Sequence, residues 1–527
     1  MGRREITIAI TSSGQRRILT AHQGRRLKEL LSDAGIFFSL PCSGNGRCGK
    51  CVVTFKAGAP KATALDEHFL GKKDIDAGRR LLCRCILEDD CEIELDGRQG
   101  TNEEEMLVEG AMAETGITAA ECDAFGIAID IGTTTVVSSL VGKDKDEKSH
   151  IISNRYSVNH QREYGADVIS RIEAASDKEK KKRLQGLICS DLYSMVKSLL
   201  KDNNIPEKEL SEVVVSGNTT MLHLLRGFDV EGLGRYPYRT ESLELEELSL
   251  KDLLNEDFES DVRTYLLPGI SAFVGADIVS GLYYLDIIKG GKKTLFIDLG
   301  TNGEMAFFDG KELSVASSAA GPVFEGGGIS CGIASVPGAI CHVTIEGERV
   351  QYETIEGKAP VGICGTGVIE AVSELRRNDI IDAKGLLCEE HFDTGFPLAE
   401  DPEGKSIVVT QSDIRNVQLA KAAIQAGLKE LLSGQEPDGI YIAGGFGAGM
   451  NVQKIRDLRL FPEDYCDKIV VAGNTSLKGA IKYLKQVLVG REEGDKEELI
   501  AISQMAKESI LAAKDGFDES YIDALGF

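Results

Sequence analysis

The chain has 527 residues, of which 42% are hydrophobic and 27% are charged, and its formal net charge is -24. This length and composition exclude a disordered chain and a small disulfide-stabilised domain, and they indicate a globular protein of several domains. The charge is divided unevenly: the first hundred residues are slightly basic and the remainder is strongly acidic, which argues against nucleic-acid binding by the acidic part.

The first hundred residues have the pattern of a β-rich domain. The predicted elements are a hairpin over residues 5–10 and 17–20, an amphipathic helix over 26–34, and strands over 51–55 and 81–87. A hairpin, a helix and later strands in this order favour a β-grasp fold over residues 1–98. Residues 99–124 are acidic and lack a clear period, so we expect a linker there.

The chain changes its pattern near residue 125, where strands alternate with Gly/Thr turns and helices as in an α/β domain. The sequence also repeats itself: AIDIGTT at residues 128–134 returns as FIDLGTNG at 296–303, and VSGNTT at 215–220 is echoed by VAGNTS at 471–476. Two related halves around a shared cleft explain these repeats.

The expected organisation of this second part is a duplicated α/β domain over residues 125–490, with lobes at about 125–290 and 291–490. Apolar residues at helical spacing, from Leu499 to Ile510, predict a C-terminal helical segment over 491–527.

Six of the 13 cysteines lie within the first 91 residues. Cys42, Cys48 and Cys51 form a C-x5-C-x2-C motif, and Leu-Cys-Arg-Cys follows at residues 82–85. Three clustered cysteines and a distant fourth match the plant-type [2Fe–2S] arrangement, with one additional residue in the first gap. A zinc site or free thiols are the less favoured alternatives, because zinc motifs usually consist of two short pairs.

The fourth cluster ligand is ambiguous, because Cys83 and Cys85 would lie on the same face of the predicted strand. The Leu-Leu-Cys sequence ending at Cys83 resembles the Leu-Ala-Cys of [2Fe–2S] ferredoxins, to which residues 1–98 are similar. The predicted ligands are therefore Cys42, Cys48, Cys51 and Cys83, with Cys85 as the alternative, whereas Cys91 is expected to be a packed thiol. The resemblance implies one-electron transfer.

Two glycine turns carry the signature of a phosphate site. An apolar strand ends at Asp130 and is followed by Gly132, Thr133 and Thr134. Such a turn offers backbone N–H groups and a hydroxyl to phosphate oxygens, and the aspartate can hold Mg²⁺ through water. The arrangement returns after a second apolar strand as Asp298, Gly300, Thr301, Asn302 and Gly303. No Walker-type loop accompanies these turns.

These turns resemble those of the ASKHA superfamily, which includes sugar kinases and actin and binds ATP between two duplicated lobes. The resemblance implies that residues 130–134 form the first phosphate loop and residues 298–303 the second. A third glycine turn, again after an apolar strand, would be the adenosine loop with Gly444, Gly445 and Phe446. The expected ligands are ATP and Mg²⁺.

The carboxylate that aligns the attacking water is predicted to be Asp298, with Asp130 as the second choice. Asp277 and Glu325 are further candidates. His223 could be imagined as a metal ligand, but a hydrogen-bonded core histidine is the better interpretation.

A [2Fe–2S] module joined to an ASKHA ATPase resembles the reductive activators of corrinoid proteins, which serve methyltransferase and O-demethylase systems of anaerobes. Further stretches that carry this resemblance are residues 164–168, 216–223, 319–326 and 362–367. It implies ATP-dependent reduction of a Co(II) corrinoid protein to the methyl-accepting Co(I) state. It also implies a low-potential electron donor such as a ferredoxin, and a homodimer.

Two other enzyme classes share some of these features. A small-molecule kinase fused to a ferredoxin would have the same phosphate loops, and an activator of radical-type dehydratases would place a [4Fe–4S] cluster between subunits. Cys331, Cys341 and Cys364 raise the second alternative, but we expect them to be packed apolar side chains. The cysteine usage and the lack of a signal-like or membrane-spanning apolar run predict a cytoplasmic protein without membrane or nucleic-acid partners.

Overall fold

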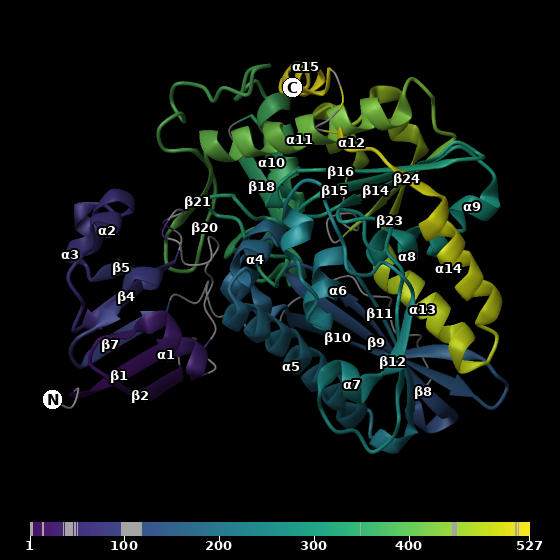
Figure 1. Ribbon diagram of the computed structural model, residues 1–527. Helices are drawn as coiled ribbons and strands as arrows, with labels where there is room; N and C mark the ends of the chain where they lie inside the picture. The colour runs from purple at the N-terminus through teal and green to yellow at the C-terminus, as the bar shows by residue number, and fades with distance from the viewer. Residues whose placement is uncertain are drawn as a thin grey trace. The chain divides into compact units, whose positions relative to one another are not determined.

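The computed structural model describes residues 4–12, 15–34, 36, 46, 49, 51–95, 118–347, 349–444, 451–511, 514 and 516–527 (Figure 1). The chain divides into two compact units, one of Met1–Glu104 with Val158–Ile188 and the other of Glu105–Ser157 with Cys189–Phe527. Among the described residues, no helix is long and apolar enough to cross a bilayer.

A five-stranded sheet in the order β2-β1-β7-β4-β5 forms the N-terminal fold. Its strands are β1 (Glu5–Ser12), β2 (Gln15–His22), β4 (Val52–Ala57), β5 (Arg79–Leu81) and β7 (Cys91–Leu95). β1 and β2 form the expected antiparallel hairpin, and β1 lies parallel to β7. Helix α1 (Leu27–Asp33) buries Leu27 and Leu31 in the same apolar cluster as the strands. The predicted order of hairpin, helix and later strands is confirmed.

Two short helices, α2 (Ala64–Phe69) and α3 (Lys72–Asp76), separate β4 from β5 and were not expected. The single strand predicted over residues 81–87 is wrong. β5 ends at Leu81, a 3-10 turn occupies Leu82–Arg84, and the short strand β6 is Ile86–Leu87. Leu81, Leu82 and Cys83 are all buried, and a strand cannot place three successive side chains on one buried face.

The α/β part contains two six-stranded sheets. The first has the order β10-β9-β8-β11-β13-β12, and the second has the order β23-β22-β14-β15-β16-β24. In the first sheet the strands are β8 (Cys122–Ile131), β9 (Thr135–Asp144), β10 (Ser149–Val158), β11 (Leu210–Gly217), β12 (Glu246–Ser249) and β13 (Arg263–Leu266). In the second they are β14 (Thr294–Leu299), β15 (Gly303–Phe308), β16 (Leu313–Ser318), β22 (Gly439–Ala443), β23 (Ile469–Gly473) and β24 (Ala506–Glu508).

Five strands of each sheet share one topology, which confirms the predicted duplication, whereas the sixth strands, β12 and β24, extend opposite ends of it. In each, a central strand pairs antiparallel with the strand that follows it and parallel with a later strand, as β8 does with β9 and β11, and β14 with β15 and β22. The two Asp-containing motifs end the two central strands. β8 and β14 are therefore equivalent.

The second sequence echo does not mark equivalent positions. VSGNTT follows β11, next to the central strand, whereas VAGNTS follows β23, which is the outer neighbour of β22. The similarity has a local cause, because in both cases an asparagine ends the strand region and caps a helix. Asn218 accepts a hydrogen bond from the N–H of Met221 in α6 (Thr219–Arg226), and Asn474 accepts one from Leu477 in α13 (Thr475–Leu488).

Helices α8 (Ala276–Tyr284) and α13 cross closely and connect the two halves. They share an apolar cluster with strands of both sheets, including Ala128 and Phe296. At the crossing, the Ser280 hydroxyl donates a 2.7 Å hydrogen bond to the carbonyl oxygen of Ser476. The N-terminal ends of these two helices carry Asp277 and Ser476 toward the motifs described above.

A Gly479→Ala substitution is expected to lower the free energy of unfolding by about 1–3 kcal/mol. A Cβ at this position of α13 would lie 2.2 Å from the main-chain oxygen of Ser280, which cannot move away without separating the helices. Gly494 in α14 (Glu493–Met505) is the matched control, because no atom lies within 4 Å of its added Cβ. Denaturant unfolding should show the loss for Gly479→Ala alone, and equal values for the two variants would contradict a tight crossing.

The second half also contains the long helices α10 (Gly365–Arg377) and α11 (Gln411–Leu432), whose apolar faces join the core beside the second sheet (Figure 1). The C-terminal segment is not wholly helical. α14 is followed by β24, which extends the second sheet parallel to β16, and then by α15 (Phe517–Asp523). Ala506, predicted as helical, pairs with Leu313 in that sheet.

Candidate functional site

The sheet and the 3-10 turn bring two of the predicted cluster cysteines together. Cys51 immediately precedes β4, and its carbonyl oxygen accepts a 2.6 Å hydrogen bond from the N–H of Leu82. The turn over Leu82–Arg84 then directs the Cys83 thiol to the Cys51 thiol, with which it is hydrogen-bonded. This contact lowers the pKa of Cys83 to about 7, helped by the nearby cations of Arg84 and Lys28 and opposed by burial. Cys42 and Cys48 lie outside the described residues.

Cys85 has a different environment. Its thiol is 4% exposed and donates a 3.4 Å hydrogen bond to the carbonyl oxygen of Leu81, and burial raises its pKa. Cys91 starts the core strand β7, and burial raises its pKa to about 11. Both are therefore placed as packed thiols, and the geometry favours Cys83 as the partner of Cys51.

A buried carboxylate fixes the segment that leads to Cys83. Asp66 in α2 is 1% exposed and accepts a 2.7 Å hydrogen bond from the N–H of Leu81. Its second oxygen accepts hydrogen bonds from the N–H and the hydroxyl of Thr63. The sequence pattern did not reveal this residue, because its partners are defined only once α2 packs on β5.

The first predicted phosphate loop is the turn between β8 and β9. Its hairpin is closed by a 2.9 Å hydrogen bond from the N–H of Gly132 to the carbonyl oxygen of Thr135. A Cβ on Gly132 would lie 2.7 Å from that oxygen, so the turn requires glycine. The Thr133 hydroxyl accepts a 3.1 Å hydrogen bond from the side chain of Asn218.

Asp130 precedes this loop and is held by residues from the other half of the α/β part. The Ser476 hydroxyl donates to Oδ1 at 2.6 Å, and the side-chain amide of Asn474 donates to Oδ2 at 2.9 Å. Both donors belong to the start of α13. They were missed as site residues, although the Gly-Asn-Thr echo contained them.

The second predicted loop is the equivalent turn between β14 and β15, closed by a 3.0 Å hydrogen bond from the N–H of Gly300 to the carbonyl oxygen of Asn302. Gly303 begins β15, where a Cβ would lie 2.2 Å from Ile424. Gly444 follows β22 with φ of 98°, and a Cβ on it would lie 2.8 Å from Oδ1 of Asp298. The third glycine turn therefore begins directly against the second loop. Gly445 and Phe446 lie outside the described residues.

Carboxylates from several elements converge at these turns. Burial raises the pKa of Asp277 to about 7, and repulsion from Asp130 contributes. Burial, with repulsion from Asp277 and Asp130, raises the pKa of Asp298 well above its ordinary range. Glu304, on β15 opposite Asp298, has its pKa raised in the same way and was not predicted. A concentration of buried negative charge of this kind fits a site that is completed by a cation.

The described residues contain no group of three His, Cys, Asp or Glu side chains that could hold a metal ion directly. The carboxylates and glycine turns fit the water-mediated Mg²⁺ and the ATP phosphates inferred from the sequence. The contacting thiols of Cys51 and Cys83 fit two ligands of a [2Fe–2S] cluster.

His223 and Cys364 have the surroundings of packed core residues. His223 is buried, with Nδ1 2.8 Å from the carbonyl oxygen of Thr219 and Nε2 accepting a hydrogen bond from the N–H of Glu241, as expected for a core histidine. The Cys364 thiol is buried and donates a 3.3 Å hydrogen bond to the carbonyl oxygen of Ile340. Cys331 and Cys341 are half-buried.

The fold and these sites define an ASKHA-type nucleotide-binding domain in one chain with a [2Fe–2S] ferredoxin domain. Comparison with known families agrees with this definition. Residues 292–527 match the C-terminal domain of RACo, the ASKHA domain, residues 125–290 match the RACo middle region, and residues 10–88 match the 2Fe-2S iron-sulfur cluster binding domain. The chain therefore belongs to the RACo family.

Individual relatives carry related descriptions. The chain is 33% identical to the corrinoid activation enzyme RamQ of Eubacterium limosum, over 68% of this chain and 64%, slightly under two thirds, of RamQ. It is 25% identical to the [Co(II) methylated amine-specific corrinoid protein] reductase of Methanosarcina barkeri, over 76% of this chain and 77% of that protein. The solved structure of a reductive activator for corrinoid,iron-sulfur protein is 27% identical in sequence and has a TM-score of 0.69. The match covers 99% of this chain and 98% of the chain in that structure.

Proposed function

We propose that this protein is an ATP-dependent reductive activator, which reduces the Co(II) corrinoid of a partner protein to Co(I) for methyl transfer. The observation that carries the proposal is the presence, in one chain, of the Cys51–Cys83 thiol pair and of a duplicated ATP-type site. The similarity to a solved reductive activator along 99% of the chain supports it.

The two parts have separate tasks in this proposal. When bound by Cys42, Cys48, Cys51 and Cys83, a [2Fe–2S] cluster supplies one-electron transfer. Reduction of Co(II) from a ferredoxin-level donor is uphill, and a gap of roughly 300 mV corresponds to about 7 kcal/mol for one electron. The phosphate loops bind ATP and Mg²⁺ in this proposal. The carboxylates beside the loops position the water that attacks the γ-phosphate. Asp298 is the proposed aligning carboxylate.

ATP can drive the uphill reduction if the α/β halves adopt states with different affinities for the Co(II) and the Co(I) partner. The α8–α13 crossing supports this idea, because both helices start at the nucleotide site and connect the halves. In this scheme ATP hydrolysis is coupled to reduction because the two nucleotide states differ in their affinity for the corrinoid partner. The ATPase rate should therefore change when the corrinoid partner is added.

The proposed electron donor is a low-potential protein such as a ferredoxin, and the proposed assembly is a homodimer. The proposed location is the cytoplasm, because the cysteines of the first 91 residues form a cluster motif of the kind that needs a reducing compartment.

The test uses anaerobically purified protein and follows the visible spectrum of a Co(II) corrinoid protein in the presence of a low-potential reductant. We expect the Co(I) band only after addition of ATP with Mg²⁺. An intact cluster spectrum with ATP turnover, but without Co(I) for any corrinoid protein of a methyltransferase system, would contradict the proposed acceptor.

A further inference from the structure

Glu325 contacts both predicted phosphate loops. The hydroxyls of Thr134, in the first loop, and of Thr301, in the second, both donate hydrogen bonds to its Oε2 at 3.0 Å. One carboxylate oxygen therefore joins the two halves of the duplicated domain, at the hydroxyls that the ASKHA resemblance assigns to nucleotide phosphate.

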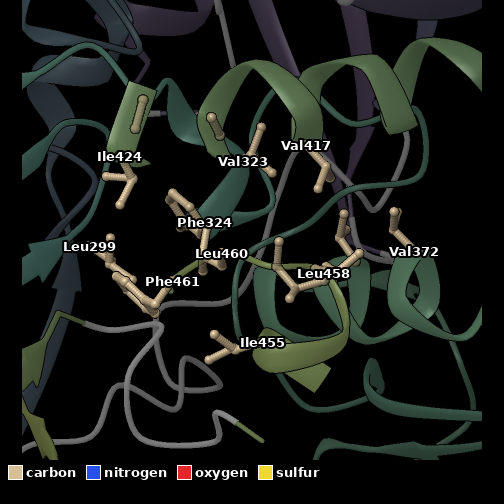
Figure 2. Packing of buried hydrophobic residues seen from close by; sticks show 14 of the residues in the cluster. Leu299, Val323, Phe324, Val372, Val417, Ile424, Ile455, Leu458, Leu460 and Phe461 are labelled. Atoms are coloured by element: carbon tan, nitrogen blue, oxygen red, sulfur yellow. The ribbon is translucent and has the colours of Figure 1, made fainter. Parts of the chain in front are cut away.

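The main chain that carries Glu325 is firmly placed. The residue ends a 3-10 turn (Pro322–Glu325) whose Val323 and Phe324 are buried in the apolar cluster that also contains Leu299, as Figure 2 shows. A Cβ on Gly365, at the start of α10, would lie only 1.9 Å from the carbonyl oxygen of Phe324. The turn is thus packed from two sides, and the half-buried Glu325 side chain is the part that can move.

A phosphate group and the Glu325 carboxylate compete for the same donors. Each threonine hydroxyl has a single proton, which can be donated to Oε2 or to a phosphate oxygen. The two acceptors are also both anionic, so they repel each other when they approach the same hydroxyl pair. Phosphate binding and the Glu325 contacts therefore exclude one another.

We propose that Glu325 is a displaceable substitute for nucleotide phosphate, which holds the two loops together in the nucleotide-free protein and must leave them when ATP binds. This inference rests on the proposed function, since it takes the turns at 132–134 and 300–303 to be phosphate loops. Glu325 acts as a positioning residue that lowers the affinity for phosphate-bearing ligands and leaves the affinity for adenosine unchanged. The two halves of the α/β domain are then joined through Glu325 when nucleotide is absent and through the nucleotide phosphates when it is bound.

The test compares wild-type and Glu325→Gln protein by calorimetric titration with Mg²⁺·AMP-PNP and with adenosine. Removing the charge should tighten AMP-PNP binding about tenfold or more, because hydrogen bonds to a carboxylate are stronger than those to an amide. Adenosine, which has no phosphate to reach the hydroxyls, should bind as before. Glu312→Gln is the matched control: this carboxylate lies in the same half, is 55% exposed and pairs with Lys507.

Each result decides the matter. Unchanged or weaker AMP-PNP binding by Glu325→Gln would overturn the proposal, as would an equal gain for adenosine. Glu325→Ala, which removes both oxygens, must show the same selective gain, and a thermal melt of each variant verifies that it is folded. Wild-type protein that binds neither ligand would overturn the proposed ATP site and the role of Glu325 with it, whereas wild-type binding without the selective gain would overturn the role of Glu325 alone.

Discussion

A Cys83→Ala variant is expected to purify without the [2Fe–2S] centre and to form no Co(I) with ATP. The physical reason is the placement of Cys83 by the 3-10 turn, which brings its thiol into contact with that of Cys51. A cluster of this type needs four ligands, and removal of one from a preformed pair leaves an iron position incomplete. Iron per chain, the visible spectrum and the electron paramagnetic resonance signal of the reduced protein measure the loss.

Cys85→Ala is the matched control, because it removes a thiol two residues away in the same buried region. Its hydrogen bond to Leu81 is weak and local, so we expect the cluster signal and Co(I) formation to persist. Cys91→Ala, in the core of β7, should likewise keep the cluster. If Cys85→Ala lost the cluster while Cys83→Ala retained it, the fourth ligand would be Cys85 and the turn would have to rearrange around the bound iron.

The choice between Cys83 and Cys85 shows where sequence analysis reaches its limit. Strand alternation places both thiols on one face and cannot separate them. The distinction arises from Leu82, which is buried beside Leu81 and begins the 3-10 turn, because the strand already ends at Leu81. The sequence does not show that Leu81, Leu82 and Cys83 are all buried. In the structure β5 pairs with β4 only as far as Leu81, and the turn begins at the next residue.

The nucleotide site follows a similar pattern. The repeated Asp-x-Gly-Thr motif was enough to predict the duplicated domain and to propose two phosphate loops, because each motif is contiguous and ends an apolar strand. Asn474 and Ser476, which hold Asp130, lie more than 300 residues from it in the sequence. Their echo with residues 215–220 pointed to equivalent strands, whereas the shared feature is a helix cap. Glu304 was missed because it looks like an ordinary strand residue until β15 pairs with β14.

Asp298→Asn is expected to reduce ATP turnover at least about 100-fold, the usual range for loss of a positioned acid–base group. Among the described residues, none donates a hydrogen bond to the Asp298 carboxylate, whereas Asp130 is held by Ser476 and Asn474. Asp298 thus remains available to water or Mg²⁺-bound water at the nucleotide. The measurement is phosphate release under saturating ATP, with AMP-PNP titration to verify that nucleotide still binds.

Stability separates this effect from simple damage to the fold. The charged form of Asp298 is disfavoured by burial and by the neighbouring carboxylates, so the neutral amide of Asp298→Asn should raise the melting temperature of the nucleotide-free protein while turnover is lost. Asp130→Asn should gain less than Asp298→Asn, because burial also raises the pKa of Asp130 but the hydrogen bonds from Ser476 and Asn474 favour its charged form, and the amide cannot accept both as the carboxylate does. Full ATP turnover in Asp298→Asn would contradict the role of Asp298 and assign alignment of the water to Asp130 or Asp277. A lowered melting temperature of the same variant would contradict the expected relief of charge repulsion, and would show that the native carboxylate makes stabilising contacts.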